Sequence, residues 1–195
     1  ARKTFRNEIY RDYKANRSEA PDDLVPQFEY IRKSVLAFNL PSVELINYEA
    51  DDLIATYVDK ILANGAKVTI VSSDKDLMQL YKKDVRIFDP MKNKFISDVD
   101  VKNKFGVDPD KVVDVQSLAG DSSDNVPGVP GIGIKTAAEL INKYGNLEKL
   151  LKSAKEIKQN KRRETLLENK DNALISKKLV TLGHKSPIKR ELNEF

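Results

Sequence analysis

Helical and extended patterns alternate regularly between residues 49 and 88, and this alternation constrains the fold more than any other feature. Apolar residues recur at helical spacing over residues 49–64, and Gly65 is a natural helix end. Residues 67–72 hold three β-branched apolar residues between turn-forming ones, which predicts a buried strand. A helix over 75–81 and a strand over 85–88 continue the pattern. The order favours an α/β fold with a parallel sheet and helical crossovers.

The second half of the chain has a different character. Gly and Pro crowd residues 120–133, and the remainder is helical to about Leu182 without a convincing strand. A helical subdomain therefore packs on, or borders, the sheet. We expect three regions, which are an α/β core over residues 1–108, a helical subdomain over 109–185 and an exit linker over 186–195.

The N-terminal segment is a basic arm that ends near Ser18. It is followed by a predicted helix over residues 21–39, whose apolar residues recur at helical spacing, and by an extended run over 43–46. A second dense basic set occupies residues 149–163. Basic flanks around acidic clusters suit a protein that holds a polyanion beside metal ions, although ordinary solvated helix faces also account for them.

Overall composition excludes several classes of protein. The chain carries 34 Lys and Arg against 30 Asp and Glu, a formal net charge of +4, and it has no Cys. The lack of Cys excludes a disulfide framework and a thiolate zinc site. No apolar run approaches the roughly 18 residues that span a bilayer, so we expect a soluble, cytoplasmic protein with no membrane partner.

Three short acidic clusters are the candidates for chemistry. The first two fall at the junction of a strand with a helix, and the third falls in a Gly-rich turn after a helix. Each also has a structural explanation, because acidic residues favour helix N-termini, cap helices and form solvated turns. The seven carboxylates are Glu49, Asp51, Asp52, Asp74, Asp76, Asp121 and Asp124.

Taken together, the clusters indicate a metal site. Ligands of open α/β sheets gather at the carboxyl ends of the strands, where the first two clusters fall. Packed carboxylates repel one another unless protons or cations neutralise them. An all-oxygen site indicates Mg²⁺ or Mn²⁺ as the cofactor, not zinc, and such a site suits metal-assisted phosphodiester hydrolysis.

A glycine-rich turn, residues 128–136, is the candidate phosphate contact. Glycines allow close backbone approach, and the helix that follows begins with free N–H groups. The spacing fits neither a Walker A loop nor a dinucleotide fingerprint, and a plain turn between two helices is the alternative. The residues concerned are Gly131, Gly133, Lys135 and Thr136. His184 in the tail has no acidic neighbour in sequence and is interpreted as a surface residue.

Four stretches carry a resemblance to a known family: FRNEIYRDYKANR (5–17), YEADDLIAT (48–56), VSSDKDLMQLY (71–81) and LAGDSSDNVPGVPGIGIKTAAELI (118–141). In this order they resemble the 5′ nuclease, or flap endonuclease-like, superfamily in its bacterial DNA polymerase I branch. The resemblance implies a PIN-like α/β core and a helical subdomain with a helix–three-turn–helix DNA-binding motif. It implies 5′–3′ exonuclease or flap cleavage of nicked, flapped or 5′-ended duplex DNA.

The resemblance also implies residue roles. The seven carboxylates match the family's metal-site residues. Tyr13, Lys14 and Arg17 resemble a basic helical gateway for a DNA 5′ end, where Lys14 and Arg17 hold the scissile phosphate. Gly131, Gly133, Lys135 and Thr136 resemble the turn that grips duplex backbone, often with K⁺.

The resemblance has one gap. Family members begin with an Asp-bearing strand, and a further Asp directly precedes the stretch that matches this chain. We therefore expect a fragment without its first strand, from a monomeric parent chain that also carries polymerase domains. The alternatives are a non-catalytic module that binds branched DNA and a structural scaffold whose acidic residues only cap helices.

Overall fold

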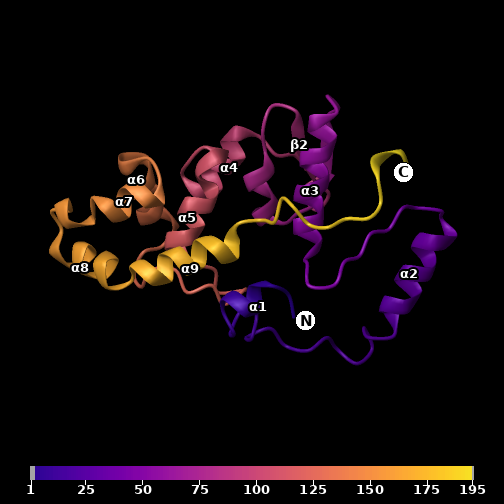
Figure 1. The fold of residues 1–195 in the computed structure, drawn as a ribbon, viewed down its shortest axis with the longest axis horizontal. Helices are drawn as coiled ribbons and strands as arrows, with labels where there is room; N and C mark the ends of the chain where they lie inside the picture. Colours follow the sequence, from indigo (N-terminus) through magenta and orange to yellow (C-terminus); the bar gives the residue numbers. More distant parts are fainter. Residues whose placement is uncertain (1–2, 195) are drawn as a thin grey trace.

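The fold is an α/β unit joined to a helical unit, as a computed structural model describes for residues 3–194 (Figure 1). The elements in the first unit are α1 (Arg6–Ile9), α2 (Gln27–Ala37), α3 (Ala50–Ala63), β1 (Val68–Val71), the 3-10 helix η1 (Lys75–Leu80), β2 (Val85–Asp89), β3 (Lys94–Phe95) and α4 (Asp98–Phe105). Those that follow are η2 (Pro109–Lys111), α5 (Val112–Ala119), α6 (Ile134–Tyr144), α7 (Leu147–Lys152), η3 (Ala154–Glu156), α8 (Asn160–Glu168), α9 (Lys170–Val180) and η4 (Leu192–Glu194).

The sheet confirms the α/β class but is mixed, not purely parallel. β1 and β2 run parallel, with Val68 opposite Val85, and β2 and β3 run antiparallel, with Phe88 opposite Phe95. The unpredicted β3 follows a tight reversal, in which the buried Asp89 carboxylate accepts the N–H groups of Met91 and Lys92. Among the described residues β1 has a strand neighbour on one side only, so it forms an edge.

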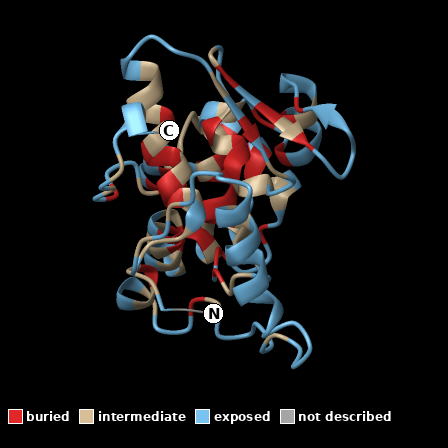
Figure 2. Cartoon of the chain, turned by 90° about the vertical axis from the view of Figure 1, so that its right-hand side faces the viewer, coloured by how far each residue is buried: buried red, intermediate tan, exposed pale blue. Residues whose placement is uncertain are grey.

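One apolar interior runs from the sheet into the helical unit. α3 contributes Val58, β2 contributes Ile87, and α5 contributes Val115 and Leu118, all at most 1% exposed and within one cluster. Figure 2 shows the buried residues, in red, gathered mainly in the middle of the molecule. Since α5 packs against both units, it holds the loop that follows it at a fixed place beside the sheet.

The N-terminal region departs most from the expected elements. The predicted helix over 21–39 is α2, which lies apart from the body in Figure 1, and none of its eleven residues is buried. The extended run over 43–46 forms no strand, although Thr4 and Asn47 make a single parallel bridge. Within the basic arm the chain forms α1, which its four residues are too short to reveal by periodicity. Arg2 of that arm lies outside the described residues.

The tail expected as an exit linker over residues 186–195 makes specific contacts with α3 at several of its described residues. Residues 183–194, here called the strap, run along α3 as the yellow segment of Figure 1. Ser186 is 5% exposed and its N–H donates to Thr56 Oγ1 at 3.1 Å, while the Tyr57 hydroxyl donates to the Arg190 carbonyl at 3.0 Å. Residue 195 lies outside the described residues. None of the described helices is long and apolar enough to cross a membrane.

Candidate metal centre and nucleic-acid interface

Three chain segments far apart in sequence bring their carboxylates to one small pocket. The pocket lies at the carboxyl end of β1, where α3 begins and where the loop after α5 passes. Arg6 and Tyr13 from the N-terminal segment complete its wall. Five of the seven predicted carboxylates line it, namely Glu49, Asp51, Asp76, Asp121 and Asp124.

Local hydrogen bonds hold each acidic segment in place. Glu49 caps α3, and its N–H donates to Asp52 Oδ2 at 3.0 Å. Asp74 caps η1 by accepting the Asp76 N–H at 2.9 Å, and it does not line the pocket. Asp121 accepts the Ser123 N–H at 2.8 Å, which shapes the loop after α5. The capping explanation considered for these residues is therefore correct for some, and it coexists with the pocket.

Cationic side chains neutralise part of this acidity. Lys14 Nζ lies 2.7 Å from Glu49 Oε1 and 3.4 Å from Asp124 Oδ2, and Arg17 also pairs with Asp124. Lys75 pairs with Asp121. The structure thus brings both predicted phosphate-binding residues, Lys14 and Arg17, to the pocket. Lys75 was missed, although its place between two aspartates in Asp-Lys-Asp was a signal for it.

Lys14 has an unusual backbone. Its φ of 59° lies in the left-handed region, which costs a non-glycine residue about 1 kcal/mol. The conformation is stabilised by the Lys14 N–H, which donates to the Asp124 carbonyl at 2.9 Å. The segment that carries the gateway residues is therefore fastened directly to the loop that carries the third acidic cluster.

The remaining carboxylates keep an excess of negative charge. Burial, together with the charges of the neighbouring Asp74, Glu49 and Asp76, raises the pKa of Asp51 to about 6. Burial is also the main cause of the raised pKa of Asp76. By contrast, hydrogen bonds from Lys75 and Ser123 outweigh burial and lower the pKa of Asp121. The unneutralised part of the pocket is therefore the side formed by Asp51 and Asp76.

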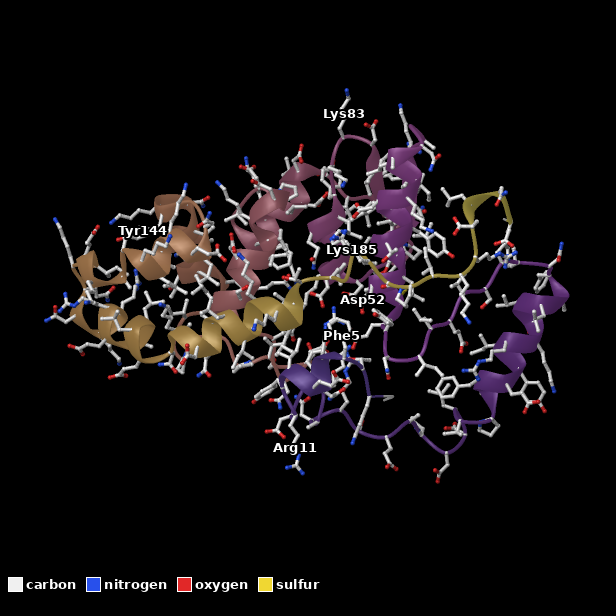
Figure 3. All side chains as sticks on the ribbon, in the orientation of Figure 1. Phe5, Arg11, Asp52, Lys83, Tyr144 and Lys185 are labelled. Atoms are coloured by element: carbon white, nitrogen blue, oxygen red, sulfur yellow. The ribbon has the colours of Figure 1, made fainter. Side chains whose placement is uncertain are left out.

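Asp52 is occupied elsewhere, which argues against its predicted place among the metal-site carboxylates. It is 0% exposed, and each of its oxygens accepts a 2.8 Å hydrogen bond from the Arg6 guanidinium. Its Oδ1 also accepts the Gly183 N–H at 2.7 Å. Burial opposes ionisation, yet the Arg6 hydrogen bonds hold the pKa of Asp52 below its usual range. Figure 3 shows Asp52 near Phe5, where α1, α3 and the strap meet.

The oxygen atoms of the pocket suit a hard divalent cation. The acidic side chains of the pocket offer carboxylate oxygens, which Mg²⁺ and Mn²⁺ prefer as ligands. No group of three acidic or histidine side chains among the described residues is spaced to hold an ion directly. Mg²⁺ commonly keeps several waters and uses one or two carboxylates, and Asp51 and Asp76 are the pocket carboxylates for which no ion pair is seen in the part of the chain that the structure describes.

Tyr13 lies in the wall of the pocket. It is 5% exposed, and its hydroxyl lies 3.3 Å from Asp124 Oδ2 and 3.4 Å from Glu49 Oε2. Burial, followed by the charge of Glu49, raises the pKa of Tyr13, so the phenol stays protonated and donates. Tyr13 was predicted to contact DNA, and in the structure its hydroxyl contacts two carboxylates of the pocket.

The glycine-rich turn is separate from the pocket and uses its glycines in two ways. A Cβ on Gly128 would lie 2.4 Å from Gly120 N, so these two glycines allow the backbone to pack on itself. Gly131, with a φ of 73°, and Gly133 have nothing within 4 Å of a Cβ position. The open pair precedes α6, whose first turn carries the exposed Lys135 and the half-buried Thr136.

His184 has a partner that its sequence neighbours did not reveal. Its Nδ1 lies 2.7 Å from Asp59 Oδ2 on α3, 125 residues away. Both side chains are exposed, so the residue is a surface histidine, as expected, that also holds the strap to α3.

The structure therefore defines a class of α/β protein. An acidic pocket edged by lysines lies at the carboxyl end of a parallel strand pair, and a helical unit with an open glycine turn is joined to it. Comparison with protein families makes the assignment specific. Residues 1–106 match the 5′–3′ exonuclease N-terminal resolvase-like domain, and residues 107–195 match the 5′–3′ exonuclease C-terminal SAM fold. The chain therefore belongs to the 5′–3′ exonuclease family.

Individual relatives agree with this membership. The chain is 55% identical over 191 residues to DNA polymerase I of Rhizobium leguminosarum, covering 98% of this chain and 19% of that one. It is 36% identical over 201 residues to a 5′–3′ exonuclease of Buchnera aphidicola, covering all of this chain and 70% of the relative. The chain thus spans about a fifth of the polymerase and most of the shorter exonuclease.

Solved structures share the fold. The 5′-exonuclease of bacteriophage T5 with bound zinc aligns at a TM-score of 0.80 and 26% identity, over 93% of this chain and 71% of that one. A T5 flap endonuclease complex with DNA and metal ions aligns at a TM-score of 0.80 and 25% identity over the same shares. The PIN-like core with a helical subdomain is thereby confirmed.

Proposed function

We propose that this chain is the 5′–3′ nuclease part of a DNA polymerase I. It hydrolyses phosphodiesters at or near the 5′ end of a strand in nicked, flapped or 5′-ended duplex DNA, within a monomeric cytoplasmic polypeptide that also carries polymerase domains. The observation that supports this most is the convergence of carboxylates from three distant segments, together with Lys14 and Lys75, on one pocket. Relatives named as DNA polymerase I and 5′–3′ exonuclease support the same assignment.

The cofactor in this proposal is Mg²⁺ or Mn²⁺, held by Asp51 and Asp76 with support from Asp121. When bound, such an ion polarises a phosphoryl oxygen and lowers the pKa of a water ligand. The chain's own residues supply the rest. Lys14 and Arg17, now paired with Glu49 and Asp124, hold the phosphate in place. Seven carboxylates were expected at the metal site, and the five that line the pocket remain its candidate residues.

Duplex DNA is gripped away from the pocket, at the turn before α6. Gly131 and Gly133 leave space for a phosphate to approach the backbone, and Lys135 and Thr136 add a charge and a hydroxyl. Backbone carbonyls of such a turn suit a K⁺ ion, which we include in the proposal. Because these contacts are to phosphates, specificity comes from the shape of the DNA and not from base reading.

The direct test replaces Asp51 and Asp76, the two carboxylates proposed to hold the ion, with Ala in the full-length natural protein that contains this chain. We expect Mg²⁺-dependent cleavage of a 5′-labelled flap substrate to fall by at least about a thousandfold, while the Kd for the flap changes little. Asp59→Ala is the matched control, because Asp59 is an exposed acid on α3 outside the pocket. Full cleavage by the double variant would exclude the metal-site assignment.

A second candidate, a non-catalytic module that binds branched DNA, has one observation in its favour. Lys14 and Lys75 already pair with pocket carboxylates, and such pairs can be purely structural. The same assay separates the candidates. Metal-independent binding of the flap without any cleavage by the wild-type protein would support the binding module.

A further inference from the structure

Gln116 is a buried polar residue that reaches from the helical unit to the acidic pocket. It lies on α5 and is 2% exposed. Its amide Nε2 donates to Asp76 Oδ1 at 2.6 Å, across 40 residues of sequence. No sequence motif singled it out. A buried amide in direct contact with a candidate cation-binding carboxylate therefore requires an explanation.

The carbonyl oxygen of the Gln116 side chain indicates that packing alone does not explain a glutamine at this position. Gln116 Oε1 is buried and has no hydrogen-bond partner among the described residues. A buried carbonyl without a partner destabilises a fold, whereas an unbranched apolar side chain of similar length would fill the same space without that cost. The contact of the Gln116 N–H with Asp76 is thus the feature that distinguishes glutamine from methionine here.

Asp76 is held differently from its neighbours in the pocket. Glu49, Asp121 and Asp124 each pair with a cationic side chain. Asp76 instead accepts from a neutral amide, which fixes the carboxylate without cancelling its charge. Its backbone is fixed independently, because the Asp76 carbonyl accepts from Gln79 Nε2 at 2.9 Å. Gln116 is therefore the residue that sets the rotation of the carboxylate itself.

We propose that Gln116 is a positioning residue, which orients the Asp76 carboxylate for a divalent cation while leaving its negative charge available. The inference rests on the proposed nuclease function. Gln116 also links the two units, because it lies on α5, which ends directly before the loop with Asp121 and Asp124. The helix α5 thus places Asp121 and Asp124 through this loop and orients the Asp76 carboxylate through the Gln116 hydrogen bond.

The test is Gln116→Met in the full-length protein, read out by Mn²⁺ titration calorimetry, thermal unfolding and flap cleavage across Mg²⁺ concentrations. Removal of a partner that orients a ligand typically weakens metal affinity by about tenfold to a hundredfold. We expect a rise of that size in the Mn²⁺ Kd and in the Mg²⁺ concentration for half-maximal cleavage. The Tm should be unchanged or higher, because an unpaired carbonyl has been removed, and kcat should recover at high Mg²⁺.

Two comparisons make the result specific. Ser117→Ala is the control, since Ser117 is a fully buried residue on the same helix that donates to the Val113 carbonyl and does not line the pocket. In an Asp76→Asn background, Gln116→Met should have no further effect on Mn²⁺ binding. An unchanged Mn²⁺ Kd, or a loss of metal affinity that only accompanies a lower Tm, would overturn the proposal. Absent cleavage by the wild type would instead refute the nuclease function, and the Mn²⁺ titration would still test Gln116.

Discussion

At the scale of single residues, Arg6 connects several separate segments of the chain through buried hydrogen bonds. It is 1% exposed, and besides both Asp52 oxygens it donates to the Leu179 carbonyl at 2.7 Å and to the Thr181 carbonyl at 3.1 Å. Its guanidinium therefore joins α1, α3 and the end of α9. The planar fork of five N–H donors suits this site in a way that a lysine would not.

Removing Arg6 should unfold the protein readily. Arg6→Met leaves a buried carboxylate and two carbonyls unpaired, so we expect a loss of about 3–5 kcal/mol in the free energy of unfolding, measured by urea denaturation. The double variant Arg6→Met with Asp52→Leu should recover much of that loss, since no buried charge then remains unpaired. Lys33→Met, which breaks an exposed pair with Glu29, is the control and should change stability by less than about 1 kcal/mol.

At the scale of elements, the open glycines before α6 allow DNA binding to be tested without a change in stability. Gly133 has a φ of −87° and an empty Cβ position, so an alanine there is free of strain. We expect Gly133→Ala to leave the Tm unchanged and to weaken duplex binding by about fivefold, because the methyl group keeps a phosphate away from the backbone. Fluorescence anisotropy with labelled duplex measures the Kd. Unaltered affinity would remove Gly133 from the interface.

The elements that could be predicted are those defined by local signals. The helix over 49–64 was predictable because its apolar spacing and terminal Gly65 are written in consecutive residues, and β1 and β2 were predictable from their β-branched runs. β3 has two residues and the strap has no periodicity, so each depends on contacts with distant segments. The packing of the strap follows from Thr56 and Tyr57, which no local pattern in the tail could reveal.

The residues of the acidic site could be predicted from the sequence better than the residues that they contact. The three clusters could be read from sequence because carboxylates stand close together in each. The partners of these residues could not be predicted from the sequence. They are Arg6 for Asp52, Lys75 for Asp121 and Gln116 for Asp76. Each of these pairs joins residues 40 or more positions apart, and only the fold brings them together.

At the scale of the whole molecule, the two proposed DNA contacts are joined by one continuous core. The pocket is lined from both units, and the glycine turn belongs to the helical unit. Duplex DNA that contacts both would therefore span a separation set by that core.

The charge on the helical unit should be visible in the salt dependence of binding. If Lys135 contacts a phosphate, Lys135→Ala should lower the slope of log K against log salt by about 1 and weaken binding of all duplex sequences alike. Titration of duplex at several NaCl concentrations measures the slope. Lys83→Ala is the control, because Lys83 is exposed at the top of the view in Figure 3 and belongs neither to the glycine turn nor to the acidic pocket. Equal slopes for the wild type and Lys135→Ala would contradict the contact.

The grip of Arg6 on the Leu179 and Thr181 carbonyls also has a consequence for biosynthesis. A ribosome releases the N-terminal segment first, so Arg6 emerges long before its acceptors. Until residue 183 has left the exit tunnel, Asp52 lacks its Gly183 partner and the pocket wall lacks Leu179 and Leu182. The nascent chain therefore reaches the arrangement described here only after residue 183 has been synthesised.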